Sequence, residues 1–130
     1  MSFDSSHVIA GSDVECFKVL IGGFGEDGKE YRSPYYHYPY RMGELSEIGL
    51  NKADVIELDR QRVLNDGVFH SYQVFAKAYQ LYCEVRTRCI NGGDRYPAHV
   101  VRCIIPRGSV VWVNYTEYAS DRIKLVEVIC

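Results

Sequence analysis

The stretch from residue 31 to residue 41 combines side chains that could bind a ligand or a partner. It holds five of the protein's eleven tyrosines, two arginines, a histidine and two prolines. The prolines exclude a helix interior and disfavour a central strand, so we expect an extended loop. Tyrosines interleaved with arginine on such a backbone can stack on bases, hold a phosphate or anchor a partner protein. The predicted binding residues here are Tyr31, Arg32, Tyr35, Tyr36, His37, Tyr38, Tyr40 and Arg41.

Three interpretations of this tyrosine loop (residues 31–41) stay open. The tyrosines can pack on a sheet while the prolines hold a long loop, which is the commonest fate of aromatic side chains. They can form a protein-binding surface, or they can form a nucleotide site.

A second candidate is the step from Gly67 to Tyr72, where a short strand at residues 68–70 is followed by a predicted helix. Ser71 is the expected N-cap of that helix, and His70 directly precedes it. Backbone N–H groups at a helix N-terminus favour an anion, and His70 could donate to it or act as an acid or base. The simpler interpretation is a histidine bonded to a carbonyl beside a serine that only caps.

Arg107 and the acids at Glu117 and Asp121 form a third group. Arg107 lies in a predicted turn, and either carboxylate could serve in catalysis, although solvated loop acids are commoner. We therefore name His70 and Glu117 as candidate catalytic groups, and His70, Ser71 and Arg107 as further binding residues. The four histidines lack ligand spacing and no phosphate-binding loop is present, so we expect neither a metal nor a cofactor.

The composition is that of one globular domain of 130 residues. A net charge of −2 argues against nucleic acid as the main partner and against an anionic membrane surface. No apolar run is long enough to span a membrane, and the first residues do not resemble a secretory signal. The five cysteines form no CxxC pair, which favours reduced thiols and a cytoplasmic location.

The elements that must position these residues begin with a polar tail at residues 1–15, followed by one domain at residues 16–130. A first strand is expected at residues 16–21. Residues 43–64 are ambiguous: Asn51 could cap a helix from Lys52 to about Leu64, or a strand could begin at Val55. A longer helix is predicted from Ser71 to Cys89, with an apolar stripe at helical spacing. The stripe consists of Val74, Ala78, Leu81, Val85 and Cys89.

The C-terminal third reads as strands. Residues 100–105 and 110–114 flank Pro106-Arg107-Gly108-Ser109, whose proline and glycine are typical of a tight turn, so a hairpin is predicted. A loop at 115–121 then leads to a strand at 122–129. The expected fold class is α+β, a mainly antiparallel sheet with one principal helix packed on it and a C-terminal three-stranded meander.

The pattern as a whole resembles small uncharacterised proteins encoded by bacteriophages and prophages. The resemblance rests on the glycine–aromatic–histidine step at 67–72, the Cys-x-Ile-Pro-x-Gly-Ser turn at 103–109 and the Ser-Asp-x-Ile strand start at 120–123. It implies an accessory protein in the host cytoplasm, where such domains often inhibit or sequester components of host defence.

A second likeness is to ADP-ribosyltransferase folds, in which an Ile-Pro-x-Gly-Ser turn follows a strand of the NAD-binding core. That family would imply NAD as cofactor, with Arg32 and Glu117 in its arginine and glutamate roles, but the chain has no Ser-Thr-Ser element. We therefore expect an accessory binding protein, acting on a host protein or a nucleotide-like ligand, rather than an enzyme. The alternatives are an NAD-binding transferase and a minor structural protein of the virion.

Overall fold

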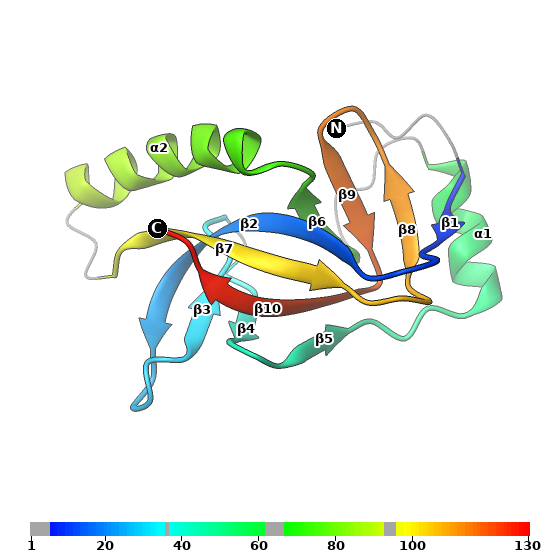
Figure 1. The fold of residues 1–130 in the computed structure, drawn as a ribbon, viewed down its shortest axis with the longest axis horizontal. Helices are drawn as coiled ribbons and strands as arrows, with labels where there is room; N and C mark the ends of the chain where they lie inside the picture. Colours follow the sequence, from blue (N-terminus) through cyan, green and yellow to red (C-terminus); the bar gives the residue numbers. More distant parts are fainter. Residues whose placement is uncertain (1–5, 36, 62–66, 93–95) are drawn as a thin grey trace.

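The fold is a long, curved antiparallel sheet with two helices against it (Figure 1). The computed structural model describes residues 6–35, 37–61, 67–92 and 96–130. The strands are β1 (Val8–Ile9), β2 (Val14–Phe24), β3 (Glu30–Arg32), β4 (Pro39–Arg41), β5 (Leu45–Glu47), β6 (Phe69–Tyr72), β7 (Ala98–Ile105), β8 (Val110–Val113), β9 (Glu117–Ser120) and β10 (Arg122–Val128). The helices are α1 (Lys52–Arg60) and α2 (Phe75–Asn91). The predicted α+β class with a mainly antiparallel sheet is confirmed.

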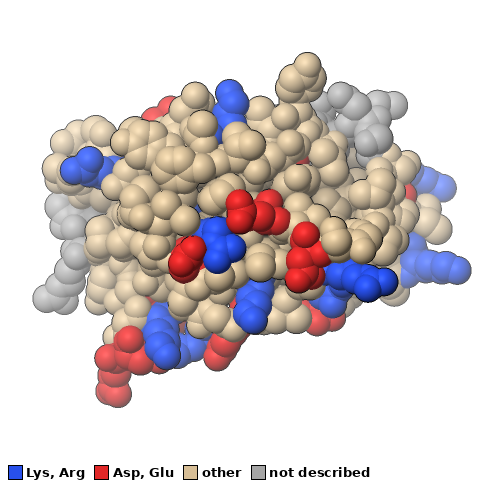
Figure 2. All heavy atoms as spheres, viewed as in Figure 1, with Lys and Arg blue, Asp and Glu red and all other residues tan. Residues whose placement is uncertain are grey.

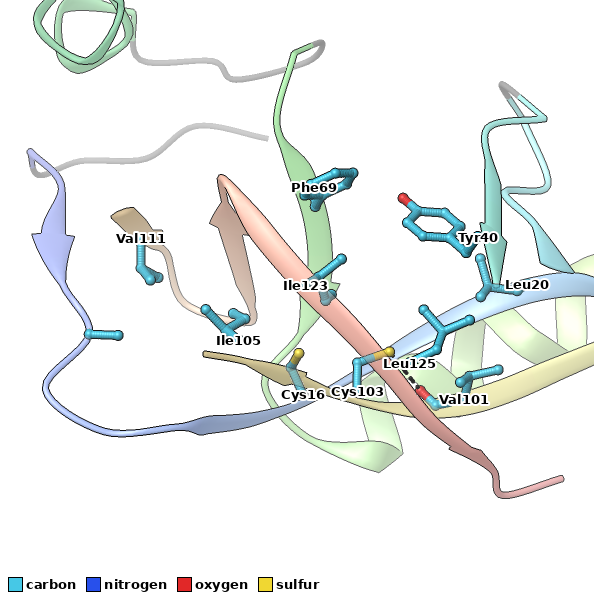
Figure 3. Close-up of a cluster of buried hydrophobic side chains, with 11 residues drawn as sticks. Cys16, Leu20, Tyr40, Phe69, Val101, Cys103, Ile105, Val111, Ile123 and Leu125 are labelled. Carbon is cyan, nitrogen blue, oxygen red and sulfur yellow. Dashed lines mark hydrogen bonds between the residues drawn. The ribbon is translucent and has the colours of Figure 1, made fainter. Parts of the chain in front are cut away.

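The strands follow one another across the sheet in the order β1-β8-β9-β6-β2-β7-β10-β5, and the β3–β4 hairpin branches from β2. At the centre, β2 and β7 pair without interruption from Val14↔Ile105 to Ile21↔Ala98. Both faces of β2 are covered, which explains its continuous apolar run. Cys16 and Leu20 belong to the core cluster on one face, whereas Phe17 and Val19 belong to the cluster under α2. Figure 3 shows the first of these clusters.

Helix α2 packs through the predicted stripe. Ala78, Val85 and Cys89 are buried against β2 and β7, which confirms the principal helix. Its start differs from the prediction, because Val74 is the N-cap and Ser71 lies within β6, paired with Tyr118 of β9. The predicted cap at Ser71 is therefore wrong: pairing with β9 extends the strand through Tyr72, and this tertiary contact overrides the local preference of serine for a helix start.

Helix α1 resolves the ambiguity of residues 43–64. The Asn51 side chain accepts a hydrogen bond from the Asp54 backbone N–H at 2.9 Å, and Asp54 accepts one from the Asn51 N–H at 3.1 Å. This reciprocal capping box confirms the helical alternative from Lys52 onward. The helix ends at Arg60, and the last predicted residues, 62–64, lie outside the described part of the chain.

The turn at residues 106–109 does not join a hairpin. β7 is flanked by β2 and β10, whereas β8 pairs with β1 and β9, so the predicted hairpin is wrong. Both edges of β7 are occupied, and the turn instead bonds to the N-terminal segment: the Gly108 N–H donates to the Ala10 carbonyl at 2.8 Å, and the Arg107 N–H donates to Asp13 at 2.9 Å. Gly108 suits this corner because its φ is +86°.

The remaining strand assignments refine the prediction. Val8–Ile9 pairs with β8, so the N-terminal segment before residue 15 contributes to the sheet rather than forming only a tail. The predicted loop at 115–121 contains β9, and the last strand is confirmed as β10. The C-terminal strands therefore form two separate pairings, β8 with β9 and β10 with β7, instead of a simple meander.

Neither helix among the described residues has the length and apolar character needed to cross a membrane. The five cysteines, all of which lie in the described part of the chain, form no disulfide.

Candidate functional site

A pocket of about 360 Å³ lies where two strands diverge from β2. β6 pairs with β2 only through Phe17↔Tyr72, and β3 pairs with it from Ile21 onward. On that edge, the described strands leave residues 18–20 without a partner. Lys18 and Val19 from this gap line the pocket, together with described residues of the tyrosine loop. It is lined by Lys18, Val19, Ser33, Pro34, Tyr35, Tyr38, Tyr40, Ile48, Gly67, Val68, Phe69, His70, Ser71, Tyr72, Leu81 and Glu117.

Three aromatic rings form one wall of this tyrosine pocket. The ring centroids of Tyr38 lie 5.0 Å from Tyr40 and 5.7 Å from Phe69, and those of Tyr40 and Phe69 are 5.9 Å apart. Tyr40 and Phe69 belong to the core, while Tyr38 is 44% exposed. In Figure 3 the labelled rings of Tyr40 and Phe69 approach each other from β4 and β6. The wall is thus rigid at its base and open at Tyr38, where a ligand ring can stack.

Lys18 is a buried charged residue that lines the pocket. Its side chain is buried to all but 8%, donates a hydrogen bond to the His70 carbonyl oxygen, and places its ammonium 5.1 Å from the Tyr40 ring centroid. Among the residues that the structure describes, no carboxylate lies within 4.0 Å of this nitrogen. A buried ammonium is usually neutralised by a nearby acid, so the positive charge here faces the pocket without a direct counter-charge.

His70 and Ser71 both line the pocket, from β6 rather than from a helix terminus. The alternative of an anion site at a helix N-terminus therefore lacks its helix end here, because α2 begins at Phe75. Ser71 is almost fully buried beside Cys16. Hydrogen bonding to Cys103 lowers the pKa of the Cys16 thiol, burial opposes this effect, and Ser71 and the positive charge of Lys18 add to the lowering.

The rim of the pocket combines aromatic and charged groups. Tyr35 is 54% exposed, and the Arg88 guanidinium from α2 lies 4.7 Å from its ring centroid. Tyr72 and Glu117 are opposite each other in the β6–β9 ladder. Burial raises the pKa of the Tyr72 hydroxyl, and the negative charge of Glu117 adds to this.

The arginines of the tyrosine loop do not line the pocket. Arg32 donates to Glu30 through Nε and Nη2, at 3.0 and 2.8 Å, and its guanidinium lies over the Phe24 ring. Arg41 pairs with Asp27 and, at 3.7 Å, with Glu44. Both arginines are therefore engaged by acids of the chain itself.

The other predicted binding residues lie apart from the pocket. Tyr31 makes an edge contact with His99 at 5.9 Å between ring centroids. His37 is exposed with a φ of +55°, and Arg107 lies in the turn next to the N-terminal segment. Tyr36 is outside the described residues. Of the predicted set, the fold brings together Tyr35, Tyr38, Tyr40, His70 and Ser71, with Glu117 from the catalytic candidates; their role in binding stays a prediction.

Sequence reasoning missed Lys18. The available signal was a lysine in the middle of the apolar strand at residues 16–21. Such a lysine reads as a solvent-facing position, and only the tertiary structure shows that it is enclosed, beside the His70 carbonyl and the Tyr40 ring.

Charges elsewhere on the surface are mixed. On the face drawn in Figure 2, acidic and basic side chains lie next to one another, without a broad patch of one sign. Within the described ranges, no three His, Cys, Asp or Glu side chains are grouped to hold a metal ion. Comparisons with protein-family models, with curated proteins and with solved structures found no match.

Proposed function

We propose that this chain is a binding protein that holds a small planar, nucleotide-like ligand in the tyrosine pocket. The observation that carries the proposal is the pocket itself, about 360 Å³ in volume and walled by Tyr38, Tyr40 and Phe69. Ligand sites typically have volumes of about 300–1,000 Å³, apolar walls and a few polar groups, and this pocket has all three properties.

Stacking on the aromatic wall supplies the affinity in this proposal. A base stacked on an aromatic side chain gains about 1–3 kcal/mol. Tyr40 and Phe69 are held in the core and lose little freedom on binding, whereas Tyr38 and Tyr35 stand at the opening and can close on the ligand. In the accessory setting that the phage resemblance implies, the protein would act by sequestering such a ligand from the host.

The test compares two exposed tyrosines. A panel of nucleosides, nucleotides and aromatic acids is titrated against the wild-type chain, Tyr38→Ala and Tyr115→Ala, by calorimetry and thermal shift. Tyr38→Ala should weaken binding about tenfold, equivalent to one stacking interaction of about 1.4 kcal/mol. Tyr115 is 99% exposed and does not line the pocket, so Tyr115→Ala should leave binding unchanged. The proposal fails when no member of the panel binds the wild-type chain, or when both variants bind equally well.

One observation favours the transferase alternative, since Glu117 and His70 line the same pocket. The arginine that this alternative requires, Arg32, is instead bound to Glu30 and lies outside the lining. An NAD-consuming enzyme would release nicotinamide, and Glu117→Gln would abolish that release. Chromatographic measurement of nicotinamide over hours of incubation with NAD decides between the two functions.

A further inference from the structure

The Lys18 ammonium is placed where it can meet a ligand rather than the chain's own acids. It lines the tyrosine pocket, and its side chain is more than nine-tenths buried. One of its three N–H groups donates to the His70 carbonyl, and the Tyr40 ring lies 5.1 Å away. A carbonyl dipole and an aromatic face stabilise a cation, but they do not neutralise its charge.

The other charged side chains around the pocket lie near Tyr35 and near Tyr72. Arg88 adds a second positive charge over Tyr35 at the rim. The acids Glu117 and Glu84 act on Tyr72, and neither is within ion-pair distance of Lys18 in the described structure. A ligand in the pocket would therefore meet a cation at one place and a carboxylate acceptor at another.

We infer that Lys18 determines ligand specificity, and that the pocket takes a planar ring carrying an anionic group, whose charge lies at the Lys18 ammonium. This inference rests on the proposed function and names the ligand class. A charge-assisted hydrogen bond to the ammonium of Lys18, a residue that is only 8% exposed, is stronger than the same bond in bulk solvent. Hydrogen-bond donors on the ring or on an attached sugar would face Glu117. A nucleoside monophosphate has both features, and an aromatic carboxylate has the first.

The test uses ligand pairs in which one member carries an anionic group and the other is neutral. Adenosine is compared with adenosine monophosphate, and indole-3-acetamide with indole-3-acetate, by calorimetry on the full chain. We expect the anionic member of at least one pair to bind about tenfold or more tightly than its neutral partner. A preference in the first pair alone identifies a phosphate ligand, and a preference in the second alone identifies a carboxylate.

Two variants separate charge from shape. Lys18→Met keeps the aliphatic stem and removes the charge, so the anionic preference should fall to about twofold or less while the neutral ligand still binds. Lys18→Arg retains the charge and should keep part of the preference. Should Lys18→Met not fold, Arg88→Gln and the wild-type pairs still test the inference, because an effect of rim charge alone would remove the preference in Arg88→Gln.

The outcomes distinguish the two proposals. Equal binding of both members of each pair by the wild-type chain overturns the role of Lys18 and leaves the binding function standing. Loss of the preference in Arg88→Gln assigns it to the rim instead and also overturns that role. Binding of neither member of either pair, nor of any ligand in the wider panel, overturns the binding function itself.

Discussion

Asp59 ties three parts of the fold together, and its removal makes a sharp test of the structure. From the last turn of α1, its carboxylate accepts hydrogen bonds from the His7 backbone N–H at 2.9 Å and from the Trp112 indole N–H at 2.9 Å. The His7 ring nitrogen Nδ1 lies 2.9 Å from the other carboxylate oxygen. The N-terminal segment, β8 and α1 thus meet at one side chain.

The expected cost of Asp59→Ala follows from these contacts. Trp112 is only 1% exposed, so its N–H would be left without an acceptor, at a cost of about 1–3 kcal/mol. The two partly exposed bonds from His7 add about 0.5–1 kcal/mol each, giving a total of about 3 kcal/mol. For a domain of this size, we expect the melting temperature to fall by roughly 10 °C.

The loss of stability in Asp59→Ala depends on pH, and the contacts of Asp59 determine whether it grows or shrinks as the pH falls. Burial would raise the pKa of the Asp59 carboxyl, but the hydrogen bonds from His7 and Trp112 outweigh burial and hold the pKa below its ordinary value of 3.8. Because the folded pKa is depressed, the ionised carboxylate contributes its full stability above pH about 4, and the contribution is lost as pH falls through the folded pKa. The difference in unfolding free energy between wild type and Asp59→Ala should therefore be largest above pH about 4 and should narrow as the pH falls below it.

Urea unfolding followed by tryptophan fluorescence measures this directly, because Trp112 is the only tryptophan. Glu57→Ala is the matched control: it removes an exposed acid from the same helix and should change the free energy of unfolding by less than about 0.5 kcal/mol. A loss at Asp59→Ala no larger than at Glu57→Ala would refute the reasoning, as would a difference in unfolding free energy that does not narrow as the pH is lowered into the acid range.

Two further predictions concern local features of the backbone. Asn51→Ala removes the capping box of α1 and should lower the free energy of unfolding by about 1 kcal/mol, measured by urea unfolding; an unchanged midpoint would contradict the cap. A Cβ at Gly22 would lie 2.6 Å from the Glu30 carbonyl oxygen, so Gly22→Ala should displace β3, cost about 1–3 kcal/mol and weaken ligand binding in the tyrosine pocket. Gly11→Ala meets no atom within 4 Å and is the control; equal melting temperatures for the two variants would argue against the close packing at Gly22.

Residue type points to much of the candidate site, but it does not show which of these residues line the pocket. The tyrosine loop and His70 were singled out by composition, and the fold brings Tyr35, Tyr38 and His70 to one pocket. Arg32 and Arg41 have the same composition signal, yet they pair with Glu30 and Asp27 and stay outside. An arginine can bind a ligand only where the fold does not place an acid beside it. The residue types in the sequence do not show where those acids will lie.

The fold likewise has parts that follow from the local sequence and parts that only distant segments decide. Local rules are sufficient where the stabilising contacts lie within a few residues: the Asn51 cap, the apolar stripe of α2 and the last strand all follow from spacing in the sequence. They fail where distant segments compete for the same groups. Ser71 pairs with Tyr118 instead of capping a helix, and the turn at 106–109 bonds to Ala10 and Asp13 instead of closing a hairpin.

The sequence by itself therefore determined the fold class, the principal helix and the residue types available for binding, while residues 43–64 stayed open between helix and strand. Tertiary structure decided which strands are neighbours, and through this which side chains share the pocket. Lys18 shows the physical reason: its position in an apolar strand is visible in the sequence, but its burial depends on the placement of Tyr40 in β4 and of the His70 carbonyl in β6, which are distant in the sequence.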